Sequence, residues 1–266
     1  MSLLLEVIDV SCGYGEKMVL KNINLSVNEG EVLGIIGPNG SGKTTLFRVI
    51  TKILTPFYGK VRFEGKDLKS ISRKELAKKV ALVSQDSIFD LTMSVMDFVL
   101  LGRIPYRSTF KFFEDDEDMR IACDSLSQTG LLQLKDEPMS NLSGGERQLV
   151  SISKAIAQNP KLLLLDEPTS HLDIGHQVRI LNLLRKLNKE KKVTEIVVFH
   201  DLNMASEFCD RLLLLSGGQI VIDGPPKQVL TFENVETVYE TMVIVKENPI
   251  SSKPYIFPVF EEWVKK

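Results

Sequence analysis

The segment GPNGSGKTT at residues 37–45 has the residue types and spacing of a phosphate-binding loop. It matches the pattern GxxxxGK[ST] in full. Glycines let such a loop curl until several backbone N–H groups point at one anion, Lys43 adds a positive charge, and Thr44 offers Mg²⁺ a hydroxyl ligand. A buried strand before the loop and an apolar helix face after it argue against a chance glycine turn. The candidate residues are Gly37, Pro38, Asn39, Gly40, Ser41, Gly42, Lys43, Thr44 and Thr45.

A pair of carboxylates follows a second apolar strand, in the sequence LLLLDEP at residues 162–168. Asp166 suits Mg²⁺ held through water. Glu167 follows at the carboxyl end of the strand, where α/β proteins bind ligands, and a carboxylate there can orient and deprotonate an attacking water. Polar residues also end strands without any role, but the phosphate-binding loop favours the catalytic interpretation.

A second pair of glycines opens an apparent helix in NLSGGERQ, which starts at Asn141. Ser143 and Glu146 have the spacing of a capping box, and apolar residues follow at helical intervals. Gly144 and Gly145 leave the backbone N–H groups of the first turn uncovered, as in an anion site. The chain therefore contains two candidate anion sites about a hundred residues apart.

Short apolar runs that alternate with helical patterns predict an α/β fold with a largely parallel sheet. The expected helices include Lys43–Leu54 and Ile174–Leu187, whereas Met18–Val27 and Gly59–Phe63 look antiparallel, with a turn at Asn28. Residues 86–160 contain helical patterns and no convincing strand, which predicts a helical insertion. The remaining expected strands are Leu3–Val10, Val32–Ile36, Val80–Ser84, Leu162–Leu165, Ile196–Phe199 and Arg211–Leu215.

Composition narrows the class of protein. The 266 residues are 43% hydrophobic, enough for a sizeable core, and the net charge of −2 speaks against an electrostatic nucleic-acid binder. Cys12, Cys123 and Cys209 lack metal-ligand spacing and fit a reduced, cytosolic setting. Glu6 interrupts the first apolar run, so we expect a strand there and no signal peptide. No apolar run reaches the roughly 18 residues of a membrane span, so any membrane role requires a partner.

The order of these motifs resembles the ATP-binding subunit of ABC (ATP-binding cassette) transporters over about residues 1–240. The resemblance rests on the phosphate-binding loop, then LSGGE, then four apolar residues with DE, then an isolated histidine after a strand. It implies a P-loop NTPase core with a mainly parallel sheet, an N-terminal antiparallel β subdomain and a helical subdomain inserted at about 86–160. Residues 241–266 would form a short C-terminal appendage.

The resemblance also assigns roles to single residues. Tyr14 would stack on adenine, Gln85 would contact Mg²⁺ or the attacking water, and His200 would contact the γ-phosphate. Asp173 would belong to the D-loop, the family's segment at the subunit boundary. His171 and His176 do not follow a strand in this way, and we expect both to be ordinary surface residues. The signature LSGGE replaces the commoner LSGGQ, and Lys154 stands where many members have Arg, but neither change removes a phosphate-facing group.

The resemblance gives the second glycine pair a purpose. In the family, two subunits pair head to tail, so that Ser143, Gly144 and Gly145 of one subunit would close over ATP bound to the other. The resemblance thus implies ATP and Mg²⁺ as cofactors, ATP hydrolysis as the reaction and a second copy of the chain as a partner.

Several classes of partner and cargo follow from the resemblance. Residues 88–113 are rich in Phe, Leu and Met, which suits a groove for a permease helix and equally suits the core of the helical subdomain. Segments such as TSHLDIGHQ favour importers of iron-siderophore complexes, haem or cobalamin, with zinc or manganese importers as the alternative. Such a subunit would sit on the inner face of the cell membrane through its permease, and a substrate-binding protein would choose the cargo.

Other classes of nucleotide-binding protein fit less well. Soluble ABC ATPases that act on ribosomes usually carry two cassettes, and those that act on DNA carry a long coiled coil, neither of which is present in these 266 residues. A phosphate-loop kinase or GTPase would need no LSGGE, and a GTPase would also need an NKxD motif, which the sequence lacks.

Overall fold

The computed structural model describes residues 2–84, 91–107 and 115–260. The chain forms two compact units. The first unit combines both ends of the chain, Met1–Ser70 and Ile196–Lys266, and the second is the continuous segment Ile71–Glu195. Strand β8 (Thr194–Val198) crosses the boundary, so its first two residues belong to the second unit and the rest to the first.

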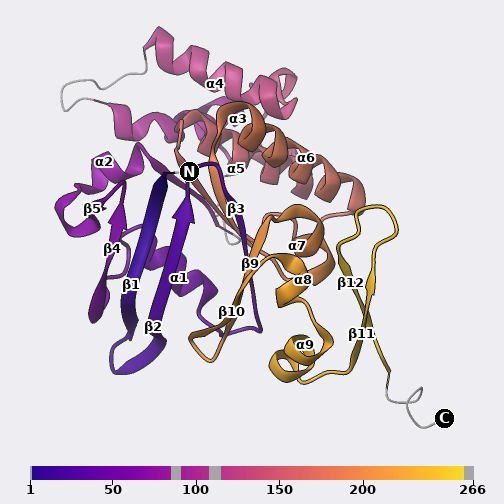
Figure 1. The fold of residues 1–266 in the computed structure, drawn as a ribbon. Helices are drawn as coiled ribbons and strands as arrows, with labels where there is room; N and C mark the ends of the chain where they lie inside the picture. Colours follow the sequence, from indigo (N-terminus) through magenta and orange to yellow (C-terminus); the bar gives the residue numbers. More distant parts are fainter. Residues whose placement is uncertain (1, 85–90, 108–114, 261–266) are drawn as a thin grey trace. The chain divides into compact units, whose positions relative to one another are not determined.

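The N-terminal part of the first unit is an antiparallel sheet with the strand order β2-β1-β4-β5 (Figure 1). Buried and exposed residues alternate along much of β2, so that one face of the sheet is apolar. The prediction that residues 18–27 and 59–63 are antiparallel strands is confirmed, because β2 and β4 each pair antiparallel with β1, which lies between them. The strands are β1 (Leu3–Tyr14), β2 (Lys17–Asn28), β4 (Tyr58–Phe63) and β5 (Lys66–Asp67), followed by the 3-10 turn η1 (Leu68–Ser70).

The first unit also contains the strand order β10-β9-β3-β8. β3 (Val32–Ile36) runs parallel to β9 (Arg211–Ser216), and β10 (Gln219–Gly224) closes the edge in the antiparallel sense. All five residues of β3 are buried, as in strands that are covered on both faces.

Helix α1 (Lys43–Ile50) follows β3 and is shorter than the sequence pattern predicts. The predicted end at Leu54 is wrong, because Lys52 adopts a left-handed φ of 59°. The backbone N–H groups of Ile53 and Leu54 instead turn back to the Arg48 carbonyl, and Ile53 is left exposed. Periodicity alone misses this end, because the apolar spacing continues beyond the last helical turn.

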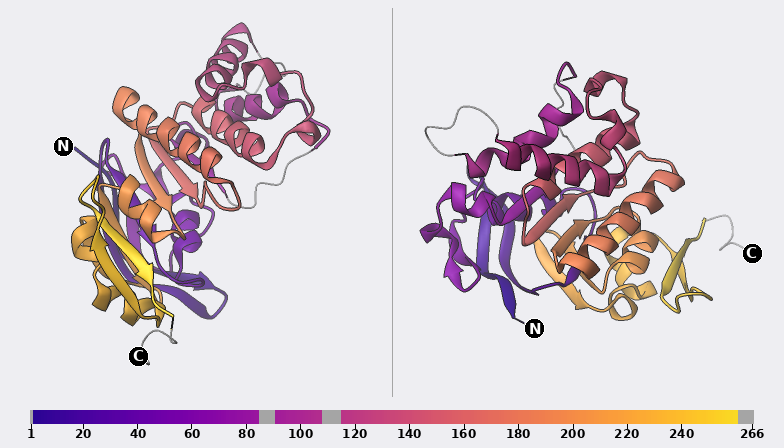
Figure 2. Two further views of the ribbon diagram at one scale, coloured as in Figure 1. Left: turned by 90° about the vertical axis from the view of Figure 1, so that its right-hand side faces the viewer. Right: turned by 90° about the horizontal axis from the view of Figure 1, so that it is seen from above.

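The C-terminal tail is more ordered than its prolines suggest. β11 (Val243–Glu247) and β12 (Pro254–Pro258) form an antiparallel hairpin beside α7 (Leu202–Phe208), as Figure 2 shows. The Ser206 hydroxyl donates to the Pro254 carbonyl at 2.7 Å, and the side chain of Asn203 bonds both backbone groups of Ile256. Two short helices, α8 (Pro226–Val229) and α9 (Phe232–Tyr239), precede the hairpin.

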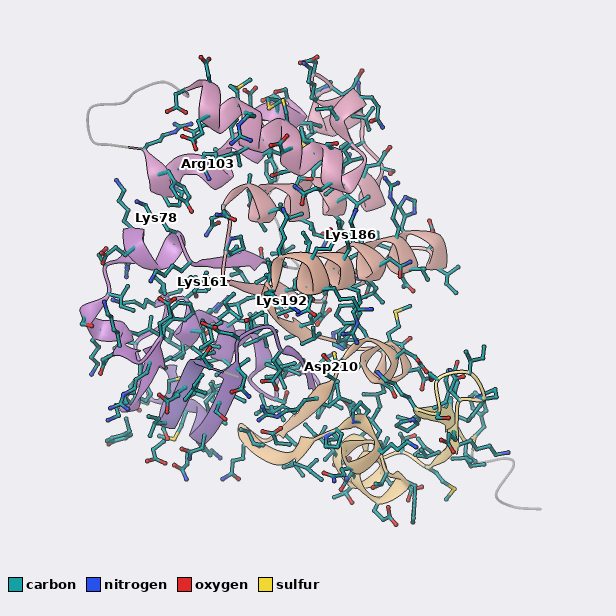
Figure 3. The ribbon with its side chains drawn as sticks, turned by 45° about the horizontal axis from the view of Figure 1, so that its top comes forward. Lys78, Arg103, Lys161, Lys186, Lys192 and Asp210 are labelled. Carbon is teal, nitrogen blue, oxygen red and sulfur yellow. The ribbon has the colours of Figure 1, made fainter. Side chains whose placement is uncertain are left out.

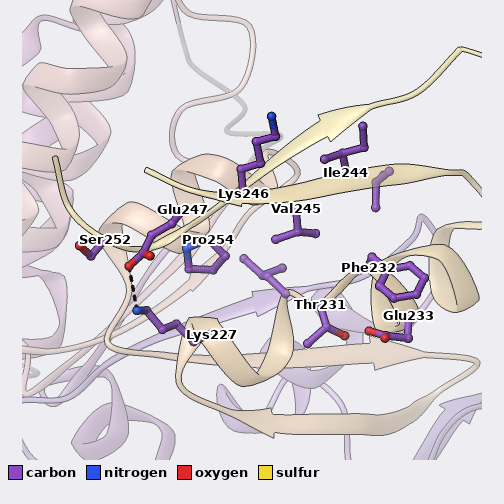
Figure 4. Close-up of a pocket in the computed structure, with 12 residues that line it drawn as sticks. Lys227, Thr231, Phe232, Glu233, Ile244, Val245, Lys246, Glu247, Ser252 and Pro254 are labelled. Atoms are coloured by element: carbon purple, nitrogen blue, oxygen red, sulfur yellow. Dashed lines mark hydrogen bonds and ion pairs between the residues drawn. The ribbon is translucent and has the colours of Figure 1, made fainter. Parts of the chain in front are cut away.

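An open groove of about 580 Å³ lies between these two helices and the hairpin (Figure 4). Phe232, Val243 and Pro254 give it apolar walls, and an ion pair joins Lys227 to Glu247 at 3.1 Å on its rim. None of the residues that line it belongs to the nucleotide motifs, so the groove is separate from the chemistry predicted above.

The second unit contains parallel strands β6 (Val80–Val83) and β7 (Leu162–Asp166), with the start of β8 next to β7. Between β6 and β7 the described residues form helices and no strand, apart from one isolated bridge, so the predicted helical character of this segment is confirmed. The helices of the unit are α2 (Arg73–Ala77), α3 (Val95–Leu100), η2 (Leu101–Tyr106), α4 (Asp116–Thr129), η3 (Leu132–Leu134), η4 (Met139–Asn141), α5 (Gly144–Ala157) and α6 (Ile174–Lys191).

A buried ion pair joins η2 to α4 in the second unit. Arg103, labelled in Figure 3, donates from Nε to Asp118 at 2.7 Å and from a terminal nitrogen to the Ala157 carbonyl at 2.8 Å. Its guanidinium lies 3.9 Å from the centre of the Tyr106 ring. Gly102 allows η2 to approach α5 closely, because a Cβ there would lie 2.2 Å from the Lys154 carbonyl oxygen. No helix within the described ranges is both long and apolar enough to cross a membrane.

Candidate functional site

The phosphate-binding loop has the curled backbone that its glycines predict. Gly37, Gly40 and Gly42 adopt φ angles of 147°, 78° and 109°. A Cβ at Gly37 would lie 2.0 Å from the Leu215 carbonyl oxygen, so no other residue fits there. Gly42 is the N-cap of α1, and the loop therefore ends at a helix N-terminus, where partial positive charge favours an anion.

Polar side chains line the same loop. The Lys43 ammonium group is buried and donates to the Gly37 carbonyl at 2.7 Å and the Pro38 carbonyl at 3.0 Å. The Ser41 hydroxyl is buried and has no hydrogen-bond partner within the described part of the chain. An orphaned hydroxyl in the same loop as a buried ammonium group fits the oxygens of a phosphate chain, whereas an apolar ligand would leave the Ser41 hydroxyl unsatisfied. The Thr44 side chain is exposed, which suits a metal ligand.

An arginine that the sequence motifs did not single out holds Tyr14. Tyr14 ends β1 with 43% of its surface exposed, and its hydroxyl accepts a 2.7 Å hydrogen bond from Arg48 on α1. The Arg48 guanidinium also lies 5.7 Å from the centre of the Tyr14 ring. Because α1 follows the loop directly, the aromatic ring proposed to stack on adenine is fastened to the phosphate-binding helix.

A second missed residue, Tyr239, comes from the end of α9. The backbone N–H of Gly37 donates to the Tyr239 hydroxyl, and burial raises the pKa of this tyrosine to about 12. The sequence separation of about 200 residues gives no local pattern that could reveal the contact. The C-terminal part of the first unit therefore touches the first glycine of the loop.

His200 lies directly after β8 in the first unit, as predicted. The backbone N–H of the preceding Phe199 donates to the Ile35 carbonyl at 3.0 Å, which brings the carboxyl ends of β8 and β3 together. Asp201 then caps α7. The first unit thus places the loop, Tyr14 and His200 on one body, with the loop and His200 after neighbouring strands.

The carboxylates Asp166 and Glu167 lie at the end of β7 in the second unit, and both are buried. Glu167 adopts a left-handed φ of 53°, an uncommon conformation for a residue with a Cβ and one that collects at functional sites. The backbone N–H and the hydroxyl of Ser170 both donate to the Glu167 carbonyl, at 3.2 and 3.0 Å. These bonds hold the turn that orients the Glu167 side chain.

The signature helix α5 begins with the predicted capping box. The Ser143 hydroxyl accepts from the Glu146 backbone at 3.3 Å, and the Glu146 carboxylate accepts from the Ser143 backbone at 2.8 Å. Hydrogen bonds from Ser143, the backbone N–H first, lower the pKa of Glu146. The Cβ position of Gly144 faces open space, whereas the ring of His176 lies against the Cβ position of Gly145.

The D-loop residue Asp173 caps α6, with a 3.0 Å bond from the His176 backbone and a 2.8 Å contact to the His176 ring. These bonds, the backbone one first, lower the pKa of Asp173. His176 was predicted to be an ordinary surface residue, and its ring, although partly exposed, contacts two of the predicted motifs. His171 is exposed, as expected.

The predicted residues fall into three groups. The first unit carries Tyr14, residues 37–45 and His200, and the second carries Asp166, Glu167, Asp173 and the signature residues. Gln85 lies outside the described residues, and so does part of the apolar segment 88–113.

Comparison with known families and proteins agrees with this arrangement of motifs. Residues 20–170 match the family "ABC transporter". The ferric enterobactin transport ATP-binding protein FepC of Escherichia coli is 35% identical over 250 residues, which cover 94% of this chain and 92% of FepC. The iron(3+)-hydroxamate import ATP-binding protein FhuC of Bacillus subtilis is 37% identical over 242 residues, which cover 91% of this chain and 90% of FhuC. The cobalamin import ATP-binding protein BtuD of Halobacterium salinarum is 32% identical, covering 91% of this chain and 60% of BtuD.

Solved structures extend the similarity to three dimensions. A chain of an ABC transporter in an inward-facing conformation superimposes on this chain with a TM-score of 0.87 at 28% identity. The superposition covers 99% of this chain and 100% of the transporter chain. A dimeric ATP-binding cassette in a post-hydrolysis state, bound to ADP and phosphate, has a TM-score of 0.73 at 31% identity. The superposition covers 84% of this chain and 98% of that cassette.

Proposed function

The chain belongs to the ABC transporter family, and on this premise we propose that it is the ATP-hydrolysing subunit of an importer for iron-siderophore complexes, haem or cobalamin. The observation that carries the ATPase assignment is the phosphate-binding loop, in which the buried Ser41 hydroxyl has no hydrogen-bond partner among the described residues and the buried Lys43 supplies positive charge. The names of FepC, FhuC and BtuD support iron-siderophore complexes and cobalamin as cargo, and haem is included from the motif resemblance alone.

The first unit would bind the nucleotide. The backbone N–H groups of residues 37–45 and the Lys43 ammonium group would hold the phosphate oxygens, and Tyr14 would stack on adenine. Thr44, Asp166 and Gln85 would hold Mg²⁺. When bound, Mg²⁺ supplies positive charge that neutralises the phosphate oxygens.

Glu167 would act as the general base. Its carboxylate would accept a proton from the attacking water, and the Ser170 bonds to its backbone would keep the carboxylate in one orientation. His200 would donate a hydrogen bond to the γ-phosphate and help hold the water.

A second copy of the chain would complete each site. Ser143 and the N–H groups of Gly144 and Gly145 would contact the nucleotide held by the other subunit, and Asp173 would lie at the boundary. The dimeric cassette with ADP and phosphate supports this arrangement. The permease and the binding protein would supply cargo recognition, with the chain on the inner face of the membrane and no role for nucleic acid.

The domain organisation that we propose has one ABC ATPase domain over residues 1–240, with a helical subdomain inserted at about 86–160. Residues 241–266 form an appendage, of which the β11–β12 hairpin is the described part.

Substitution of the proposed base tests the ATPase assignment. Glu167→Gln should keep ATP binding, lower phosphate release by about a hundredfold to ten-thousandfold, and accumulate ATP-stabilised dimers. Phosphate release measures the chemistry, and size-exclusion chromatography with ATP measures the dimer. Normal turnover by Glu167→Gln would falsify the assignment of Glu167.

Substitution at the signature tests the shared site. Ser143→Arg should keep ATP binding to the monomer but abolish turnover, because a long side chain would block the opposing nucleotide. It also removes a helix cap, at a cost of about 1 kcal/mol. Ser72→Arg is the matched control, because Ser72 forms the same capping box with Glu75 at the start of α2. Equal loss of ATP binding and turnover in Ser143→Arg would contradict the placement of Ser143 in the opposite subunit's site.

A further inference from the structure

The imidazole of His176 contacts two motifs, at Asp173 three positions earlier and at Gly145 31 positions earlier. Its Nδ1 lies 2.8 Å from the Asp173 carboxylate. Its ring covers Gly145, where a Cβ would lie 2.3 Å from ring carbon Cδ2. The side chain is 33% exposed, so about two-thirds of it is packed against the protein.

The contact with Gly145 explains why the second glycine is needed. Gly144 has open space at its Cβ position and tolerates a side chain sterically, whereas any side chain at Gly145 would displace the His176 ring. The ring therefore packs directly on the first turn of α5, next to the N–H groups proposed to face the nucleotide.

Charged groups surround the ring on each element that faces it. Asp173 caps α6 and bonds the ring. The pKa of Glu146 on α5 is lowered first by its hydrogen bonds from Ser143 and, less strongly, by the charges of His176 and Arg179. Arg179 donates to the Thr129 carbonyl at the end of α4 at 2.9 Å. The first turns of α5 and α6 are thus joined through one imidazole, with α4 attached alongside.

The bond to the ring fixes a carboxylate that would otherwise rotate. The Asp173 side chain is 67% exposed, and exposed ion pairs add little to stability because water competes and side-chain freedom is lost. The backbone N–H of His176 holds one carboxylate oxygen and the ring holds the other. The pair is therefore better suited to set the orientation of Asp173 than to stabilise the fold.

We infer that His176 is a positioning residue that locks the D-loop aspartate Asp173 to the signature glycine Gly145, so that both reach the second copy's nucleotide as one rigid surface. The inference rests on the proposed function, because the joined surface matters only if it closes over a nucleotide. It predicts that loss of the ring uncouples two motifs without disturbing nucleotide binding in the first unit.

Three variants separate this role from a structural one. His176→Ala removes the ring, His176→Phe keeps the packing on Gly145 but loses the bond to Asp173, and Lys189→Ala removes an exposed side chain from the far end of α6. We expect kcat for ATP to fall at least about tenfold in His176→Ala, with an unchanged dissociation constant for ATP. The kcat of His176→Phe should lie between those of His176→Ala and the wild type, and that of Lys189→Ala should equal the wild type.

A double-mutant cycle tests whether His176 acts through Asp173. Asp173→Asn in the wild type should lower kcat, and in His176→Ala it should have little further effect, because the bond is already lost. Additive losses would overturn the inference. A kcat of His176→Ala equal to the wild type, or an equal loss of ATP binding and melting temperature in His176→Ala and His176→Phe, would also overturn it.

A structural readout works without any turnover. The amide resonances of Gly144 and Gly145 should shift on Asp173→Asn in the wild type and stay in place in a His176→Ala background. If the wild type neither hydrolyses ATP nor dimerises with it, the proposed function fails, while these resonances still report the link. If Asp173→Asn in the wild type leaves the chemical shifts of Gly144 and Gly145 unchanged, the link itself is overturned.

Discussion

At the scale of single residues, hydrogen bonds to backbone groups fix the proposed catalytic and signature residues. Ser170 holds the left-handed turn at Glu167, and Ser143 and Glu146 satisfy each other at the start of α5. Each of these bonds spans three residues, so the types and spacing of the side chains were enough to predict the capping box. They were not enough to predict the strained turn at Glu167, because glutamate has no preference for positive φ.

The capping box at Ser143 predicts a pH dependence of the signature helix. The pKa of Glu146 lies below its ordinary value of 4.5, first because the Ser143 backbone donates to its carboxylate. Since the folded pKa is below the unfolded one, this carboxylate stabilises the folded state above about pH 4.5, and the stabilisation is lost as the pH falls through the folded pKa. A carbon-detected NMR titration should place the Glu146 midpoint below 4.5. Ser143→Ala removes the hydroxyl bond but keeps the backbone N–H, so the Glu146 midpoint should rise only part of the way toward its ordinary value. A midpoint at the ordinary value would contradict the backbone bond as the larger cause.

Long-range contacts to the site could not be predicted from the sequence. Tyr14, the phosphate-binding loop and His200 were identified from the sequence, because each belongs to a local motif or stands at a position that the family resemblance marks. Nothing marked Arg48 as the partner of Tyr14, since the residues are 34 positions apart on a strand and a helix. His176 was missed for a different reason: its bond to Asp173 is local, but the contact with Gly145 that gives it meaning requires α5 and α6 to pack together.

At the scale of elements, apolar patterns placed most strands and helices but not all of their ends. β3 was predicted with its observed bounds, because a fully buried strand has no polar interruption. α6 continues to Lys191, beyond the predicted end at Leu187, because its last turn is polar and ends the apolar pattern. The β11–β12 hairpin was missed, because Pro254 and Pro258 stand at the two ends of β12 and read as loop signals.

Two aspartates on α4 offer a matched test of burial in the helical segment. Asp118 pairs with Arg103 at 2.7 Å, with 12% and 6% of the two side chains exposed, whereas Asp124 pairs with Arg120 at 3.0 Å with more than half of each exposed. Asp118→Asn should lower the free energy of unfolding by about 3 kcal/mol, because it leaves the Arg103 charge buried without its counter-charge. Asp124→Asn should change it by less than about 0.5 kcal/mol. Urea denaturation measures both, and equal effects would contradict the role of burial.

At the scale of the whole molecule, the first unit is built from both ends of the chain. β3, which leads into the phosphate-binding loop, pairs with β9, which is about 180 residues later, and the hairpin adds bonds to α7 from the last residues described. The sequence predicted the class of this fold from the alternation of strands and helices and predicted antiparallel strands near the N-terminus, which the family resemblance grouped into a subdomain. Neither reveals that α9 touches the loop, because no local pattern links them.

The contact between Tyr239 and Gly37 predicts that the end of the chain supports nucleotide binding. Tyr239→Phe removes the acceptor of the Gly37 N–H while keeping the ring, at a cost of about 1 kcal/mol, and should weaken ATP binding about fivefold as the first glycine of the loop loses its anchor. Fluorescence titration with an ATP analogue measures the affinity. Tyr255→Phe is the matched control, because Tyr255 lies on β12 with 37% of its surface exposed. If both variants bind ATP as tightly as the wild type, α9 has no part in shaping the loop.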